Sequence, residues 1–491
     1  MASITKTTQI MNTTKKSIGN FRWTICSLLF FATTINYLDR QVLSLTWSDF
    51  IAPEFHWTNN DYGNITALFS IFYAVSLLFA GRLVDILDTK KGFLWAIGVW
   101  SVGACLHAFA GIATSGILTG NWFVGFEGAK NAIKAVNDTG MVISTSVTLF
   151  IFARFVLAVG EAGNFPAAIK TTAEYFPKKD RAFSTSIFNS GATVGALAAP
   201  ITIPFIAKAF GWEMAFIIIG ALGFVWMGFW VLLYDKPENH PMVSPEELEY
   251  IQQDVIADSK LVGYVAETAT KVTFKDCFKY KQTWAFAFGK FMTDGVWWFF
   301  LFWTPAYLSS VYDMDATEAA LPLFVLYMIT LLSIIGGWLP TYFVEKKGMN
   351  PYDGRMKAML IFAFFPLLAL VAQPLGHYTY WLPVIIIGIA GAAHQSWSAN
   401  IFTTVGDMFP KKAIATVTGI GGLAGGLGST LINKGSGVLF DYTKETNMAF
   451  MGFEGIEAGY FIIFSICAVC YLIGWSVMKT LVPKYSPITD L

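Results

Sequence analysis

The amino-acid sequence predicts an all-α integral membrane protein, because of its composition, the length of its apolar runs and the loops that recur in its two halves. Of the 491 residues, 55% are hydrophobic and only 13% are charged, whereas a soluble domain carries about 25% charged residues. The 44 phenylalanines and 17 tryptophans suit lipid contact and the membrane interface. The net charge of zero gives nucleic-acid binding no electrostatic support.

Twelve apolar runs have the length needed to cross a bilayer, which is about 20 residues each. They form two groups of six, separated by a polar segment, so we expect an N-terminal half over residues 1–234, a cytoplasmic linker over 235–283 and a C-terminal half over 284–491. The linker contains one surface helix capped by Ser244. The expected spans are 21–46, 63–84, 93–114, 146–169, 182–208, 213–234, 284–309, 319–344, 357–373, 379–404, 413–437 and 457–480.

Lysine and arginine concentrate in alternate loops, and this bias predicts the orientation of the chain. The N-terminal segment carries Lys6, Lys15 and Lys16, and the loops after every second span are also basic. Both termini and the linker are therefore expected in the cytoplasm. The longer segment 115–145 is expected outside, where its "EGAKNAIKAV" stretch suits a short interfacial helix.

Two pairs of loops indicate that the halves are repeats. "GRLVDILDTKKG" follows the second span and "GGWLPTYFVEKKG" follows the eighth, while "EYFPKKDRA" follows the fourth and "GDMFPKKAIA" follows the tenth. Repeated six-span halves around a site at the membrane midplane are typical of secondary transporters.

The first of these loops resembles the signature of the major facilitator superfamily. Gly81 permits close helix approach, and Asp85 is placed to pair with basic groups at the cytoplasmic mouth, beside Lys90 and Lys91. The glycine that this superfamily usually carries near position 88 is Asp88 here. The second copy of the loop is degenerate. The resemblance implies the twelve-helix, two-half fold of that superfamily.

A longer stretch from Ala153 to Pro200, "ARFVLAVGEAGNFPAAIKTTAEYFPKKDRAFSTSIFNSGATVGALAAP", resembles the anion:cation symporter family within that superfamily. "NYLDRQ", "TDGVWWFFLFWTPAYL" and "AAHQSWSAN" are similar to the hexuronate transporters, which import galacturonate and glucuronate with protons. Nearly the whole chain outside 115–145 shares the resemblance. Ala192 stands where a galactonate-type pattern has glutamine, which favours a hexuronate over an aldonate.

Among the charged residues within the apolar spans of the N-terminal half, two acids and two arginines make a charge-balanced set: Asp39, Arg40, Arg154 and Glu161. Arg154 and Glu161 are seven residues apart and so project from one helix face. Asp39 and Arg40 point about 100° apart on a helix, so they do not simply neutralise each other. The resemblance implies that Asp39 and Glu161 carry protons in the central cavity. The plainer alternative is that these pairs are static struts between helices.

The expected ligand is a carboxylate with a ring of hydroxyls, and an arginine fork fits a carboxylate with two hydrogen bonds. In the seventh span, Lys290 and Asp294 are four residues apart and form either an intrahelical ion pair or an anion site. Sugar sites combine aromatic faces with amides and hydroxyls. His394 is either a substrate contact or a hydrogen-bonded core residue. The expected substrate contacts are Tyr37, Arg40, Tyr73, Arg154, Asn189, Lys290, Asp294, His394, Gln395 and Trp397.

Two further patterns have simple interpretations. "CAVC" (Cys467 and Cys470) has redox spacing but no accompanying histidine or second pair, so we interpret it as small apolar filler. "GIGGLAGGLGS" (Gly419 to Ser429) lacks the lysine-serine ending of a phosphate loop, so it predicts close helix packing.

These features lead to one functional hypothesis and two alternatives. The chain is expected to be a proton-coupled symporter that imports a hexuronate by alternating access, acting as a monomer in the bacterial inner membrane, with lipid and a sugar-acid anion as its only partners. No metal or organic cofactor is expected, the proton being the coupling ion, and the protein is not an enzyme. The alternatives are a facilitator or antiporter of another organic anion, such as glucarate or an aldonate, and a membrane sensor built on a transporter fold.

Overall fold

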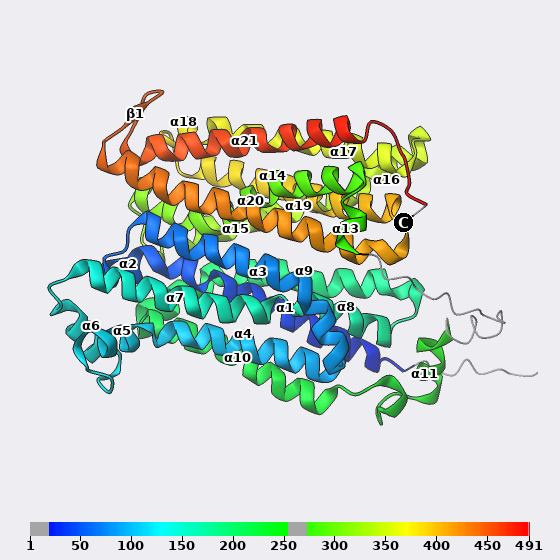
Figure 1. Cartoon of the computed structure of the whole chain (residues 1–491), viewed down its shortest axis with the longest axis horizontal. Coiled ribbons are helices and arrows are strands. Elements are labelled where there is room, and N and C mark those ends of the chain that lie inside the picture. The colour runs from blue at the N-terminus through cyan, green and yellow to red at the C-terminus, as the bar shows by residue number, and fades with distance from the viewer. Residues whose placement is uncertain (1–18, 254–272, 490) are drawn as a thin grey trace, which may run out of the picture.

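The computed structural model describes residues 19–253, 273–489 and 491, so the N-terminal lysines Lys6, Lys15 and Lys16 lie outside the described residues. Long helices run side by side in two bundles (Figure 1). The N-terminal half contains α1 (Phe21–Thr46), α2 (Ala52–Phe55), α3 (Asn59–Leu87), α4 (Thr89–Ala108), α5 (Ala110–Thr119), α6 (Gly125–Lys134), α7 (Thr139–Glu161), α8 (Asn164–Tyr175), α9 (Lys178–Phe210) and α10 (Trp212–Leu233), with the π-helical turn η1 (Trp47–Ile51).

The C-terminal half contains a matching set of helices. They are α14 (Lys281–Tyr312), α15 (Ala320–Thr330), α16 (Ile335–Lys347), α17 (Pro351–Phe364), α18 (Ala372–Gly376), α19 (Trp381–Met408), α20 (Lys411–Glu445) and α21 (Gly455–Leu481). The 3-10 turns η3 (Leu331–Ile334) and η4 (Phe365–Val371) join broken spans, and β1 (Ala449–Phe450) pairs antiparallel with β2 (Phe453–Glu454). The polar segment between the halves carries η2 (Pro237–Asn239), α11 (Pro245–Ile251) and α13 (Phe274–Cys277).

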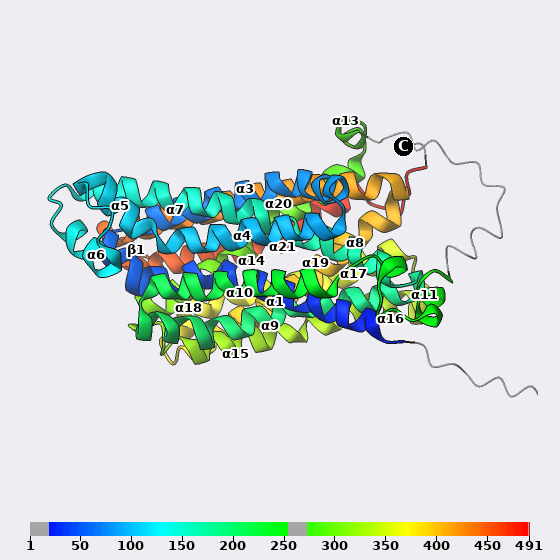
Figure 2. The same cartoon turned by 90° about the horizontal axis from the view of Figure 1, so that it is seen from below.

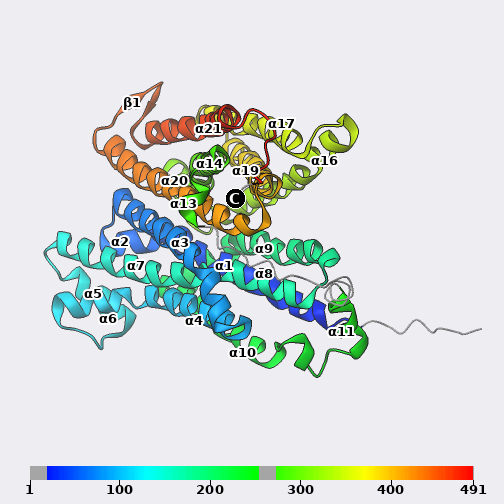
Figure 3. The ribbon, with the colours of Figure 1, turned by 45° about the vertical axis from the view of Figure 1, so that its right-hand side comes forward.

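The two ends of the bundle carry different short elements (Figure 2). The end with α2, α5, α6 and the β hairpin is called the insertion end here, and the end with α11 and α13 is called the linker end. Figure 3 shows α3 and α20 side by side where the two halves meet. The same pair makes the most extensive contact between helices of different halves.

Twelve long helical units within the described residues fit the expected membrane spans. Eight have the length and apolar composition of a span on their own, and a ninth is the pair α4 and α5, which is bent by 53° at Phe109. The other three units are α1, α14 and α20. Of these, α1 contains Asp39 and Arg40, α14 contains Lys290 and Asp294, and α20 contains the glycine run. These residues lower the mean hydropathy of the three helices.

The third and fourth spans differ in extent from the sequence prediction. The fourth was expected to begin at residue 146 but begins at Thr139, because the Asp138 carboxylate caps the helix by accepting a hydrogen bond from the Met141 N–H at 3.0 Å. The third was expected over 93–114 but bends after Ala108. The short helix expected in the 115–145 segment is confirmed as α6.

The linker helix α11 is fastened to the first span. Ser244 caps α11 as predicted, with its hydroxyl accepting from the Glu247 N–H at 3.1 Å. Glu247 is fully buried, and its carboxylate accepts hydrogen bonds from the backbone N–H groups of Phe21 at 3.2 Å and Arg22 at 3.0 Å. It therefore satisfies the free donors at the start of α1, as a capping side chain does within a single helix.

The glycine run lies inside α20, as the packing interpretation predicted. A Cβ added at Gly425, Gly426 or Gly428 would collide with Asp294, Ala74 or the Phe291 carbonyl, so these positions let α3 and α14 approach the α20 backbone. The two cysteines of the "CAVC" stretch are buried and unpaired.

Candidate functional site

Arg40 and Glu161 form a buried ion pair between α1 and α7. Arg40 Nη2 lies 2.7 Å from Glu161 Oε2, and Nε donates to the same oxygen at 3.0 Å. The side chains are 4% and 0% exposed. Burying two charges costs free energy unless the partners are well aligned, so this geometry makes the pair possible inside the apolar bundle.

Aromatic rings surround the Arg40 guanidinium. Its Cζ atom lies 4.7 Å from the ring centroid of Tyr73, 5.1 Å from Tyr37 and 4.9 Å from Trp298. Tyr37 and Tyr73 belong to the N-terminal half, whereas Trp298 comes from α14 of the C-terminal half. Arg40 therefore joins the two halves through cation–π contacts.

Arg154 and Asp39 lie in the same charged cluster but are not paired by hydrogen bonds. Arg154 is 2% exposed and Asp39 is 1% exposed. Arg154 Nε and Nη1, both oxygens of Asp39 and Oε1 of Glu161 make no well-aligned hydrogen bond within the described chain, and the Trp100 side chain interacts with Asp39. Asp39 interacts electrostatically with both Glu161 and Arg154. The cluster thus holds two arginines and two carboxylates with unused hydrogen-bonding capacity, and buried polar groups rarely lack partners without a functional reason.

Lys290 and Asp294 form the intrahelical pair that their spacing predicts. Lys290 Nζ lies 2.7 Å from Asp294 Oδ2, with the side chains 6% and 15% exposed. Lys290 also lies 4.2 Å from the ring centroid of Phe402. Gly425 on α20 leaves room for the Asp294 carboxylate. The pair is compatible with either a strut or an anion site.

His394 lies in a cluster of aromatic side chains in the C-terminal half. His394 Nδ1 is 2.7 Å from the Tyr471 hydroxyl, and its ring stacks on Trp297 with centroids 5.4 Å apart and planes 3° apart. Trp397 is fully buried and meets the Tyr471 ring edge-on at 5.5 Å. Gln395 is only partly buried. Tyr471 of α21 therefore connects two residues expected from the sequence.

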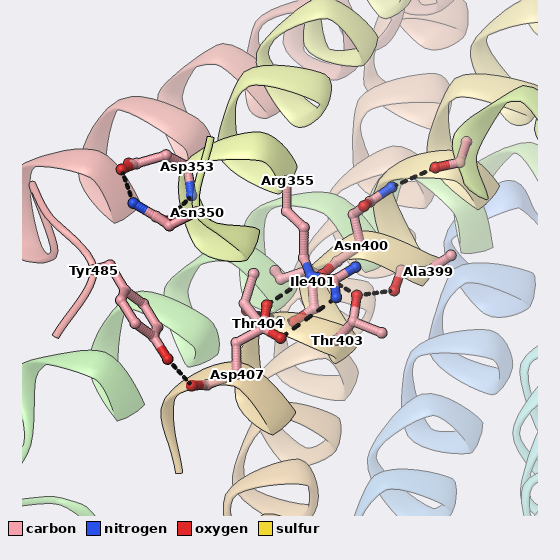
Figure 4. A network of polar contacts seen from close by, with 11 residues as sticks. Asn350, Asp353, Arg355, Ala399, Asn400, Ile401, Thr403, Thr404, Asp407 and Tyr485 are labelled. Carbon is pink, nitrogen blue, oxygen red and sulfur yellow. Dashed lines mark hydrogen bonds and ion pairs between the residues drawn. The ribbon is translucent and has the colours of Figure 1, made fainter. Parts of the chain in front are cut away.

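Other polar residues are exposed or hold helices together. Asn189 lies on α9 with an exposed side chain. Asn400 Nδ2 donates to the Gly336 carbonyl at 2.9 Å and so joins α19 to α16. Nearby at the linker end (Figure 4), Arg355 Nε lies 2.6 Å from Asp407 Oδ2, which fastens α17 to α19.

The loop residues Gly81, Asp85, Lys90 and Lys91 lie at the linker end of α3 and α4. Asp85 pairs with Lys170 at 3.1 Å, and Lys90 lies 3.9 Å from Asp235. A Cβ added at Gly81 would meet only Pro166, at an ordinary 3.9 Å, so the close helix approach expected at Gly81 is not seen. Lys91 is exposed. Asp88, at the usual glycine position, has a φ of 67°, a conformation that glycine adopts readily and aspartate tolerates less well. The backbone there keeps the turn that glycine favours.

Three residues of the site were missing from the sequence prediction of substrate contacts: Phe69, Trp298 and Tyr471. Phe69 lies four residues before Tyr73 on α3, and it contacts the Arg154 guanidinium with a Cζ-to-centroid distance of 5.1 Å. Helical spacing could have indicated Phe69. Trp298 lies in a run of aromatic residues and Tyr471 in an ordinary apolar span, so neither had a local signal. The described residues contain no cluster of three or more His, Cys, Asp or Glu suited to a metal ion.

The sequence matches known transporters along most of its length. The chain is 27% identical over 470 residues to the hexuronate transporter of Escherichia coli K12, covering 94% of this chain and 95% of that protein. It is 25% identical to the probable galactarate/D-glucarate transporter GarP of the same bacterium, covering 93% and 95% of the two chains. It is also 26% identical to a galacturonate transporter of Dickeya chrysanthemi, covering 68% and 85%.

Solved structures support the same fold. A bacterial homologue of the human lysosomal transporter Spinster superposes with a TM-score of 0.64 at 18% identity, covering 94% of this chain and 97% of that chain. The xylose transporter XylE from E. coli superposes with a TM-score of 0.63 at 14% identity, covering 96% and 99%. The family model described as Major Facilitator Superfamily matches residues 29–432. The chain is therefore a multi-pass membrane transporter, not an enzyme, and it belongs to the Major Facilitator Superfamily.

Proposed function

We propose that this protein imports a hexuronate, such as galacturonate or glucuronate, together with protons. The observation that carries the proposal is the buried Arg40–Glu161 pair beside Arg154 and Asp39. Within the described residues, Arg154 Nε and Nη1 and both Asp39 oxygens are buried without a well-aligned hydrogen-bond partner. A uronate carboxylate matches the planar donor fork of an arginine. The names of the similar transporters, which include a hexuronate and a galacturonate transporter, support the substrate class.

Competition for Arg40 supplies the coupling. A proton on Glu161 removes the negative charge that holds Arg40, so the guanidinium becomes available to the substrate carboxylate. When the proton leaves, Glu161 regains its charge and competes with the bound anion. Asp39 is the second proton carrier in this scheme, and Arg154 is the second donor to the anion. Intramembrane charges of this kind commonly mark ion and proton pathways.

The C-terminal half supplies contacts to the rest of the sugar. Trp298 reaches Arg40 from α14, so an anion at Arg40 lies against an aromatic face. Trp297, His394 and Tyr471 form a connected aromatic and hydrogen-bonding group, and such groups suit the apolar faces and hydroxyls of a sugar ring. Rocking of the two halves about this site gives alternating access.

The proposed orientation places the linker end in the cytoplasm and the protein in a bacterial inner membrane. Exposed Lys91 lies in the first turn of α4, and exposed Lys346 and Lys347 lie in the last turn of α16, all at the linker end, in keeping with the excess of positive charge on the cytoplasmic side. The insertion end, with α5 and α6, then faces outward.

The test is uptake of radiolabelled galacturonate into vesicles with an imposed inward proton gradient. Native protein is expected to accumulate substrate and to lose this accumulation with an uncoupler. Glu161→Gln is expected to abolish gradient-driven accumulation but to retain exchange of labelled for unlabelled substrate. Glu127→Gln is a matched control, because Glu127 is 86% exposed on α6, and it should behave as native.

The outcomes separate the proposal from its alternatives. Uptake that ignores the proton gradient would show a facilitator or an antiporter. Competition by galactarate or glucarate, but not by glucuronate, would move the assignment to another sugar acid, as the similarity to GarP suggests. Absence of transport for all these anions would leave only the transporter fold.

A further inference from the structure

The two halves are joined at the insertion end by direct contact between α3 and α20. A Cβ added at Gly437 would lie 2.5 Å from the Asn59 carbonyl, and one added at Gly63 would lie 3.0 Å from the Asn433 carbonyl. These glycines let the two backbones touch. Tyr62 also donates a hydrogen bond across the boundary, to the Phe302 carbonyl at 2.9 Å.

One carboxylate of the C-terminal half caps the first turn of α3. Asp441 Oδ1 accepts from the Asn59 N–H at 3.0 Å, and Oδ2 accepts from the Asn60 N–H at 2.7 Å. The Asn59 side chain adds a third hydrogen bond to Asp441 at 2.9 Å. Thr58 supplies the usual cap within the chain, because its hydroxyl accepts from the Asp61 N–H at 3.3 Å. Asp441 therefore serves the donors at the start of α3 that Thr58 does not reach.

This arrangement is favourable in three ways. A carboxylate at a helix N-terminus complements the positive end of the helix dipole, and its hydrogen bonds to N–H groups are charge-assisted. Lys434, also on α20, donates to the Asn60 side chain. Asp441, Asn59 and Asn60 are partly exposed, so water can replace these hydrogen bonds when the halves separate. The contact is therefore strong enough to matter and still reversible.

A second contact joins the two halves at the insertion end, on the side of the bundle opposite α3 and α20. There α9, the fifth span of the N-terminal half, meets the start of α15, the second long unit of the C-terminal half. Lys208 Nζ lies 3.0 Å from Asp315 Oδ2, and both side chains are about half exposed, at 59% and 49%. This exposed pair contributes little. Asp49 of η1 also accepts a hydrogen bond from the Ala316 N–H on that side, so each side of the insertion end has a carboxylate that binds backbone N–H groups of the other half.

We infer that Asp441 is a positioning residue that holds the insertion end closed, and that its contact with Asn59 and Asn60 sets the balance between the two access states of the transporter. The contact exists only while α3 and α20 are together, so it stabilises the closed insertion end relative to the open one. A differential contact of this kind is what shifts a two-state equilibrium. The inference goes beyond the proposed function, because it holds for any substrate.

The test measures the separation of the halves by pulsed electron spin resonance. Spin labels are placed at Thr119→Cys on α5 and Glu445→Cys on α20, which are exposed positions near the insertion end of different halves, after replacement of the five native cysteines. Asp441→Ala is expected to raise the ratio of open to closed molecules roughly tenfold, as expected for loss of hydrogen bonds to a charged acceptor. Asp138→Ala is the matched control, because Asp138 caps α7 within one half, and it should leave the distances native.

A conservative variant guards against loss of folding as the explanation. Asp441→Asn keeps the size of the side chain but leaves one acceptor oxygen where the carboxylate has two for the Asn59 and Asn60 N–H groups. It should therefore open the insertion end by less than Asp441→Ala does. Native distances in Asp441→Ala and Asp441→Asn, or equal opening in Asp138→Ala, would overturn the inference. None of these readouts depends on galacturonate transport, so they stand apart from the test of the proposed function.

Discussion

Arg40 donates two hydrogen bonds to one oxygen of Glu161, and the second oxygen of that carboxylate is buried without a partner. The two donor distances are 2.7 and 3.0 Å, both to Oε2, while Oε1 has no partner within the described residues. Removing one member of a buried pair typically costs about 3–5 kcal/mol, because the other charge is left alone. Protonation of Glu161 together with binding of a substrate carboxylate to Arg40 avoids that cost, because no charge is then left alone.

Arg40→Lys is expected to raise the half-saturating galacturonate concentration roughly tenfold or more. Lysine keeps the charge but loses both the planar fork and the stacking on Tyr73 and Trp298. Initial rates of uptake into vesicles over a range of galacturonate concentrations measure the change. Arg355→Lys is the control, since Arg355 pairs with Asp407 at the linker end. An unchanged half-saturating concentration in Arg40→Lys would remove Arg40 from the substrate site.

Trp298→Leu is expected to weaken substrate binding by roughly tenfold while the protein stays folded. The substitution removes the aromatic contact between α14 and the Arg40 guanidinium, and such contacts are worth about 0.5–2 kcal/mol. Trp338→Leu is a suitable comparison, because Trp338 is 60% exposed on α16. Equilibrium binding of labelled galacturonate to the purified variants makes the measurement. Equal effects of the two substitutions would show that Trp298 has no special role.

A double-substitution experiment decides whether the Lys290–Asp294 pair is a structural strut or part of the substrate site. For a strut, Lys290→Met and Asp294→Asn should each reduce transport and lower the unfolding temperature, and the combination should recover both, because no buried charge is left alone. For an anion site, the combination should recover the unfolding temperature but not transport. Uptake rates and thermal unfolding curves of all three variants give the answer.

The stability of the insertion end is expected to depend on pH through Glu54. Burial raises the pKa of Glu54 to about 7, with Glu213 and Glu127 adding to the rise, while the Trp212 indole and Lys130 oppose it. The unfolded chain has the ordinary value of 4.5. Between these values the folded protein binds more protons than the unfolded protein, so the free energy of unfolding falls as pH rises from 4.5 to about 7 and then levels off.

Glu54→Gln imitates the protonated side chain and should remove this part of the pH dependence. The unfolding temperature of the native protein is expected to fall by a few degrees more than that of the variant between pH 5 and pH 8. Glu345→Gln serves as a control because Glu345 is exposed at the linker end of α16. Parallel curves for the native protein and Glu54→Gln would contradict the assignment.

The sequence predicted the helices well and the contacts between distant helices poorly. Long apolar runs mark spans directly, and the charges Asp39, Arg40, Arg154 and Glu161 are conspicuous within them. Their pairing was not predictable, because the partner of Arg40 lies 121 residues away and depends on how α1 packs against α7. Tyr471 and Asp441 show the same limit, since each acquires its role only from helices of another part of the fold.

The start of the fourth span illustrates a smaller error of the same kind. Residues 139–145 are less apolar than the run that follows, so hydropathy alone placed the boundary at residue 146. The helix begins earlier because Asp138 caps it. A capping residue extends a helix beyond its apolar part, and the length of the apolar run alone does not contain that information.

The capping of α1 by Glu247 matters for any attempt to produce the transporter as two complementary fragments. A first fragment that ends at residue 234 would leave the N–H groups of Phe21 and Arg22 without the carboxylate that they bind in the intact chain. A fragment that continues to Gln253 would retain α11 and this cap. The polypeptide is therefore better divided after the linker helix than at the end of the sixth span, and fragment pairs cut at the two positions should differ in their yield of assembled protein.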